Sequence, residues 1–196
     1  MYAQKITLIS TDKGVGVNKA GQIFAAAGGI TLSADGKIGN SGSIVAADKA
    51  TAGTANSAAV HISGPSLDNS GSISAQGKAH INSQSLNNSG LIASAHELNI
   101  RNQNHLNNSG DINAARLDVV SGSLSNTGRI SQTGLQNLAI NAGRVDNRNQ
   151  GLIGYTPADA GGSNNTGRGT GNSGSNPGSG NTAPPSTAGG GGSTIT

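Results

Sequence analysis

The sequence predicts an all-β protein, a right-handed parallel β-helix of about seven coils. The first observation behind this prediction is a tetrad of the form Leu-x-Asn-x-Gly-x-Ile, which recurs along the middle of the chain. The second observation is a set of apolar pairs, each flanking one polar residue, which lie between the tetrads and recur with the same spacing. The two motifs share a period of about 20 residues. A fixed period of about 20 residues indicates a stack of equal units, each covering the apolar face of its neighbour.

The tetrads place an aliphatic residue, an asparagine, a glycine and an isoleucine at alternate positions. They are Leu67-Asn69-Gly71-Ile73, Leu86-Asn88-Gly90-Ile92, Leu106-Asn108-Gly110-Ile112 and Leu124-Asn126-Gly128-Ile130, with degenerate copies at Ile38-Asn40-Gly42-Ile44 and Val145-Asn147-Gly151-Ile153. From Leu67 to Val145 the starts lie 18 to 21 residues apart. Equivalent residues superimpose when coils stack about 4.8 Å apart, so the aliphatic columns are predicted to form a dry interior.

The asparagines are predicted to form a ladder at one corner of each coil. There each side-chain amide can bond the next amide and the nearby backbone. The alternative is that Asn-Ser-Gly only marks solvent-exposed turns. The glycine two positions after each asparagine is predicted to supply the positive φ that turns the corner.

The apolar pairs between the tetrads predict short strands with one buried face, because apolar and polar residues alternate there with period two. The pairs are Ile30/Leu32, Val60/Ile62, Ala79/Ile81, Leu98/Ile100, Leu117/Val119 and Leu138/Ile140. Each coil is therefore expected to contain two or three very short strands. No stretch shows helical spacing with helix start and stop signals.

Three irregularities interrupt the repeat. A surplus in residues 46–59 predicts a loop projecting from the stack, and two extra residues between Asn147 and Gly151 predict a bulge in the last coil. After Tyr155 the chain becomes rich in Gly, Ser and Asn, which cannot bury enough surface to offset its ordering entropy. We therefore expect a β-helix over residues 1–157 and a disordered tail over residues 158–196.

Composition excludes several classes of function. The net charge is only +3, the basic residues are scattered, and the three aromatic residues offer no platform for stacked bases, so nucleic acid is not an expected partner. The chain has no cysteine and therefore no disulfide or thiolate metal site. No apolar run is long enough to span a membrane, and the start of the chain lacks an export signal.

No residue carries a convincing catalytic, cofactor or metal assignment. His61 and His80 are predicted to stack outward on adjacent coils, in a column continued by Asn99 and Asp118, which lacks a well-placed third ligand. The nine acidic residues are dispersed, whereas polysaccharide-cleaving enzymes use paired carboxylates. We therefore expect no enzyme and no cofactor.

The tetrads and intervening pairs over residues 2–156 resemble the filamentous haemagglutinin repeats. These repeats build the shafts of bacterial two-partner secretion exoproteins, including adhesins and contact-dependent inhibition effectors. The opening residues 1–8, followed by residues 11–17 and 20–23, look like the stretch that follows the secretion domain in such proteins. The secretion domain itself is missing from this sequence, so we expect a fragment of such a protein.

The resemblance implies a structural shaft segment of a secreted adhesin or effector, mediating adhesion or display at the bacterial surface. It also implies two partners for the parent protein, an outer-membrane secretion transporter and a receptor or glycan on a host or neighbouring cell. Two alternatives stay open: a catalytic β-helix acting on polysaccharide, and a carbohydrate-binding lectin.

Overall fold

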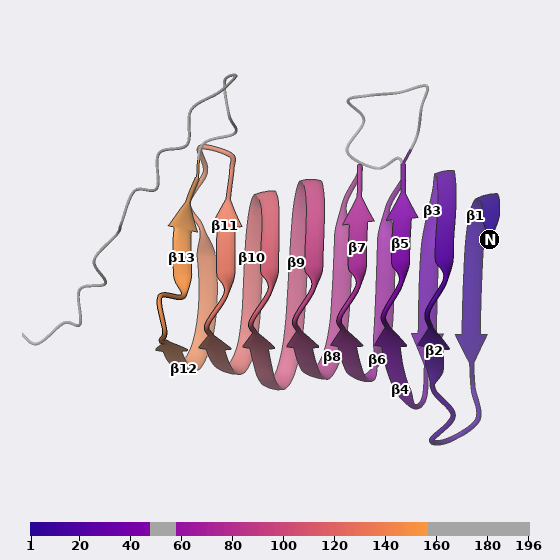
Figure 1. Cartoon of the computed structure of the whole chain (residues 1–196), viewed down its shortest axis with the longest axis horizontal. Coiled ribbons are helices and arrows are strands. Elements are labelled where there is room, and N and C mark those ends of the chain that lie inside the picture. Colours follow the sequence, from indigo (N-terminus) through magenta and orange to yellow (C-terminus); the bar gives the residue numbers. More distant parts are fainter. Residues whose placement is uncertain (48–57, 157–196) are drawn as a thin grey trace, which may run out of the picture. The chain divides into compact units, whose positions relative to one another are not determined.

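The computed structural model describes residues 1–47 and 58–156, and in this part the chain is a parallel β-solenoid (Figure 1). Its 13 strands join in one sheet that winds around the molecule, and every strand pairing is parallel. Each coil hydrogen-bonds to the coil before it and the coil after it. The predicted stack of about seven coils is confirmed.

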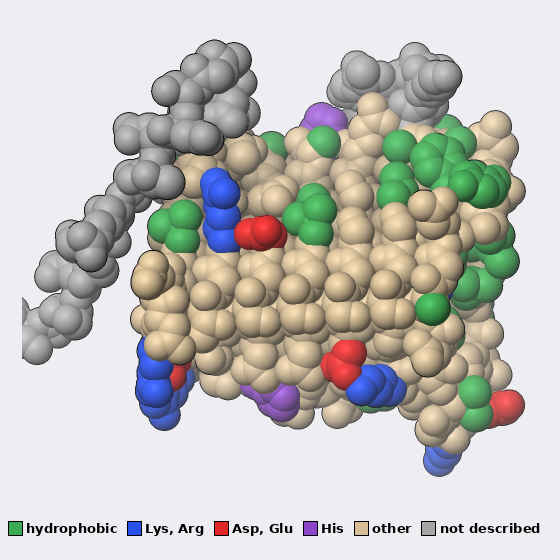
Figure 2. Space-filling model, viewed as in Figure 1, with side chains coloured by type: hydrophobic (Ala, Val, Ile, Leu, Met, Phe, Trp, Pro, Cys, Tyr) green, Lys and Arg blue, Asp and Glu red, His purple; other side chains and the backbone are tan. Residues whose placement is uncertain are grey.

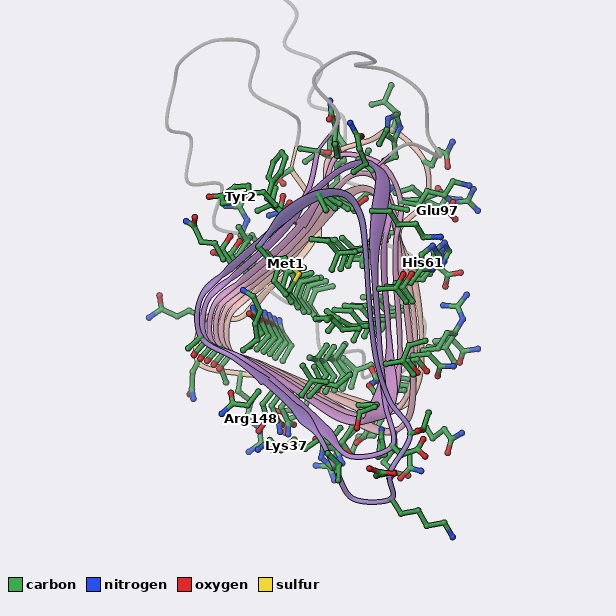
Figure 3. All side chains as sticks on the ribbon, turned by 90° about the vertical axis from the view of Figure 1, so that its right-hand side faces the viewer. Met1, Tyr2, Lys37, His61, Glu97 and Arg148 are labelled. Carbon is green, nitrogen blue, oxygen red and sulfur yellow. The ribbon has the colours of Figure 1, made fainter. Side chains whose placement is uncertain are left out.

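Each coil has three faces, which give the stack a triangular outline when viewed along its axis (Figure 3). The first face contains β5 (Ser43–Ala46), β7 (Ser72–Ala75), β11 (Arg129–Gln132) and β13 (Leu152–Tyr155), together with the starts of β3 (Gln22–Ala34), β9 (Leu91–Asn108) and β10 (Asp111–Asn126). β6 (Val60–Asn69), β8 (Ala79–Asn88) and β12 (Ala139–Asn147) turn from the second face onto the third. β1 (Tyr2–Ser10) covers the first two faces of the first coil, and β2 (Val17–Lys19) and β4 (Lys37–Asn40) lie on the third.

The interior is filled by columns of identical or similar aliphatic side chains, as the repeats predict. The tetrad isoleucines Ile73, Ile92, Ile112 and Ile130 are fully buried, as are Leu86 and Leu106. The apolar pairs of the second face, such as Leu98 with Ile100, are equally buried, except for Leu138 and Ile140 in the last coil, which are only partly buried. The core is thin, but each side chain packs against its equivalents above and below, so no coil buries its apolar face alone.

The prediction about the tetrad glycines is wrong in its cause. Among the described residues the glycines with positive φ are Gly14 and Gly29, neither of which belongs to a tetrad. The tetrad glycines are needed because of close backbone stacking. A Cβ added at Gly71 would lie 2.0 Å from the carbonyl oxygen of Gly42, and one at Gly90 would lie 2.0 Å from that of Gly71. Any side chain at this position would push the coils apart.

The irregularities fall between strands. In the predicted 46–59 loop, residues 48–57 lie outside the described part, while Ala47 and Ala58 donate backbone hydrogen bonds to Ala25 and Ala27. The two extra residues after Asn147 form a turn rather than a strand bulge, with positive φ at Asn149 and Gln150.

The predicted tail falls within residues 157–196, outside the described part, so its disorder and the domain boundary stay predictions. Within residues 1–47 and 58–156 there is no apolar helix of membrane-spanning length.

Candidate functional site

The asparagines of the tetrads form a continuous amide ladder inside one corner of the stack. Each Nδ2 donates to the Oδ1 of the asparagine in the next coil, over distances of 2.7 to 2.8 Å, from Asn40 through to Asn147. From Asn40 to Asn126 the side chains are at most 2% exposed. The ladder prediction is confirmed and the alternative of exposed turns is excluded, because buried amides need such partners.

Each ladder asparagine from Asn40 to Asn126 meets the same set of three acceptors. The Nδ2 of Asn69 lies 3.3 Å from the carbonyl oxygen of Gly71, 2.7 Å from Oδ1 of Asn88 and 3.1 Å from the carbonyl oxygen of Leu91. Asn40, Asn88, Asn108 and Asn126 repeat this pattern. Because carbonyl oxygens only accept, the amide nitrogen must face them, so all ladder donors point toward later coils.

Lys19 occupies the ladder position of the first coil. Its side chain is 9% exposed, and Nζ donates to the carbonyl oxygens of Gly21 and Ser43, both at 2.5 Å, and to Oδ1 of Asn40 at 3.4 Å. Burial lowers the pKa of Lys19. A degenerate tetrad, Val17-x-Lys19-x-Gly21-x-Ile23, is the sequence signal for this residue, and the asparagine-based pattern missed it.

A second chain of polar side chains runs along the outside of the third face, one residue before the ladder. Nδ2 of Asn107 donates to Oδ1 of Asn87 at 2.9 Å, and Nδ2 of Asn87 donates to Oδ1 of Asp68 at 2.8 Å. The donors here point toward earlier coils, opposite to the inner ladder. The chain ends at Asp68, whose carboxylate also pairs with Lys37.

The carboxylate of Asp68 stays ionised in this setting. Burial raises its pKa, but hydrogen bonds from Lys37 and Asn87 and the charge of Lys37 outweigh burial, so the net pKa is lowered. A group held in this way is a stable acceptor and a poor general acid.

A polar furrow of about 470 Å³ follows the outer chain and the adjacent turns. It is lined by Asp68, Asn69, Ser70, Asn87, Asn88, Ser89, Asn107, Asn108, Ser109, Ser125 and Thr127. A second hollow, over the first three coils, shares Asp68 and Ser70 with it. Figure 2 shows one face on which uncharged groups form regular rows across the coils, with few charged side chains. The furrow therefore offers neutral hydrogen-bonding groups and one paired carboxylate.

His61 and His80 stack on the outside of the second face, as the sequence predicts. Their ring centroids are 5.0 Å apart and their planes differ by 7°. His61, His80, Asn99 and Asp118 occupy one register column, and Nδ2 of Asn99 lies 3.4 Å from Nδ1 of His80. Burial and the neighbouring charge of His61 lower the pKa of His80. Among the described residues no three His, Asp or Glu side chains are grouped to hold a metal ion.

Acidic side chains on this surface are paired with basic ones. Lys78 meets Glu97 at 3.2 Å and Arg101 meets Asp118 at 2.7 Å, each pair bridging consecutive coils. Burial raises the pKa of Glu97, but hydrogen bonds from Lys78 and Asn99 outweigh it and the net pKa is lowered. Asp68 and Asp111 lie on β6 and β10 in different register columns.

Part of the chain is homologous to Toxin CdiA of Yersinia pestis, a two-partner secretion exoprotein. The two sequences are 50% identical over 54 residues, which is 28% of this chain and 2% of the toxin. The chain thus matches a very small part of that protein. No family model and no solved structure matches the chain. The homology, together with the parallel β-solenoid, agrees with the resemblance to two-partner secretion exoproteins that the repeats indicate.

Proposed function

We propose that this chain is a non-catalytic shaft segment of a large secreted exoprotein of the CdiA type, which displays other elements at the bacterial surface for adhesion or toxin delivery. The regular amide ladder is the observation that carries this proposal. It bonds each coil to the next through five consecutive amide contacts, of which the first four are buried. Such a stack holds every coil at a fixed height along its axis, and Asp68, Glu97 and Asp118 on its surface are each paired with a basic side chain.

The partners of the parent protein are proposed on the same basis. The parent would leave the cell through an outer-membrane transporter of the two-partner type and meet a receptor or glycan on another cell. The partial match to Toxin CdiA supports this route. The carbohydrate-binding alternative is favoured by one observation, the furrow lined by side-chain amides and hydroxyls.

A coil deletion in the source bacterium tests the shaft role. Removing residues 91–110 deletes one whole coil and joins Gly90 to Asp111, so that Asn88 takes Asn126 as its ladder partner. Removing residues 91–100 instead breaks the register and serves as the control. We expect the whole-coil deletion to keep surface exposure, measured with antibody, and binding to partner cells, while the half-coil deletion loses both.

Two outcomes would contradict a passive shaft. One is loss of partner-cell binding by the whole-coil deletion while surface exposure persists. The other is a glycan-array signal from the isolated chain that disappears when Asn87 and Asn107 are replaced by alanine, which would favour the lectin. A signal that maps to residues 46–59 would favour a lectin site on the loop.

A further inference from the structure

Two hydrogen-bonded chains of amides run along the stack near the same corner, with their donors pointing in opposite directions. The upstream end of each chain is a charged residue. The inner ladder begins at Lys19, which can only donate, and its amide donors point downstream. The outer chain stops at Asp68, which can only accept when ionised, and its donors point upstream. In each case the terminal charge has the sign that the direction of the chain requires.

The ammonium of Lys19 reproduces the bonding of a ladder amide. Nζ meets the carbonyl oxygen two residues later (Gly21), the Oδ1 of the next coil (Asn40), and the carbonyl oxygen three residues beyond that asparagine (Ser43). Asn69 meets the corresponding acceptors in its own coil and the next. The lysine therefore supplies the donor function of an asparagine without its acceptor.

We propose that Lys19 caps the asparagine ladder and closes its upstream end to any further asparagine-bearing coil, including a coil from a second copy of this chain. A ladder asparagine placed upstream would direct its Nδ2 at the Nζ of Lys19. Two donors would then face each other with no acceptor between them, in a site that is nearly buried. The downstream end is different, because Asn147 bonds Gly151 and has no Oδ1 beyond it among the described residues. The ladder can thus be extended in one direction only.

Replacing Lys19 by methionine or by asparagine separates the cap from a space-filling role. Lys19→Met keeps the length of the stem and removes the donor. Lys19→Asn restores the amide donor and adds the missing Oδ1. Lys13→Met, in an exposed turn of the first coil, is the matched control.

Amide hydrogen exchange gives a local readout. The N–H groups of Ser41 and Ser43 donate to the carbonyl oxygens of Lys19 and Gly21, and those of Ser89 and Leu91 make the equivalent bonds in the middle of the ladder. In Lys19→Met we expect exchange at Ser41 and Ser43 to be about ten- to hundredfold faster, with Ser89 and Leu91 unchanged. Lys19→Asn should recover most of this protection.

The proposed cap is overturned if Lys19→Met exchanges like Lys13→Met, or if the methionine and asparagine variants are equally unprotected. Should Lys19→Met fail to fold, circular dichroism decides: folding of Lys19→Asn alone supports the cap, and failure of both overturns it. Sedimentation velocity tests closure of the upstream end. Concentration-dependent head-to-tail oligomers of Lys19→Asn, absent from the native chain and from Lys19→Met, support closure, and a monomeric Lys19→Asn overturns it.

Discussion

Two corners flank the third face of the stack, and they differ in how strictly they hold the coils in register. At the ladder corner, asparagine recurs in six coils and the amides bond without a break. At the opposite corner, the interior column contains Gly64, Ser83 and Asn102, with Ser121 following in the next coil. Only Asn102 and Ser83 bond to each other there, at 2.6 Å, and Oδ1 of Asn102 is buried without a partner in the described structure.

The opposite corner, called the mixed corner below because its column holds different residue types, is also where the pairing register of the strands shifts. The pairing of β8 with β9 shifts between Ser83 and Ser85, and the pairing of β9 with β10 shifts between Val120 and Ser123. In the ladder each asparagine amide is both a donor and an acceptor. Every coil must therefore place its Nδ2 and Oδ1 atoms at the same point of the coil, which fixes the register. Serine and glycine impose no such requirement, so the mixed corner can accommodate an extra residue in one coil.

The largest expected effect is at the centre of the ladder. Asn88→Ala removes the acceptor of Asn69 and the donor to Asn108, leaving two buried groups short of a partner. We expect a loss of about 3–5 kcal/mol in the free energy of unfolding, measured by urea denaturation. Asn107→Ala is the control, since its amide is exposed. An equal loss in both variants would remove the distinction between buried and exposed ladders.

The stacked glycines beside the ladder should be the next most sensitive positions. Gly90→Ala places a Cβ 2.0 Å from the carbonyl oxygen of Gly71, a backbone atom that cannot move away cheaply. We expect a loss of about 2–3 kcal/mol from overpacking. Gly154→Ala, where the added Cβ meets nothing within 4 Å, is the control, and thermal unfolding of the two variants side by side is the measurement.

The mixed corner should tolerate the matching change. Asn102→Ala removes one hydrogen bond to Ser83 but also removes the buried oxygen that lacks a partner. We expect a loss of only about 1 kcal/mol, measured by urea denaturation under the conditions used for Asn88→Ala. A loss as large as that of Asn88→Ala would mean that both corners fix the register equally.

The smallest effect concerns pH on the second face, away from both corners. Because the pKa of His80 is lowered, the folded chain binds fewer protons there than the unfolded chain, so stability falls as pH decreases from about 6.5 through the lowered pKa. His80→Asn, which continues the column with Asn99, should reduce this acid sensitivity of the melting temperature. His105→Asn, an exposed position on the third face outside this column, is the matched control.

The sequence by itself determined the coil and its interior. Period-two alternation in pairs such as Leu98/Ile100, repeated with the tetrads, predicts which side chains face inward, because superposition follows from the period alone. The same argument places the asparagines in one column and His61 over His80. These are properties of equal spacing, which a sequence displays directly.

Only the tertiary structure showed why the tetrad glycines are required and what Lys19 does, because the spacing of residues in the sequence carries neither. That the tetrad glycines are required by a carbonyl oxygen of the neighbouring coil, rather than by φ, depends on how closely two backbones approach. That Lys19 takes the place of an asparagine depends on the reach of its stem to three oxygens from two coils. Both facts depend on distances between atoms of different coils, which are fixed only when the coils pack together.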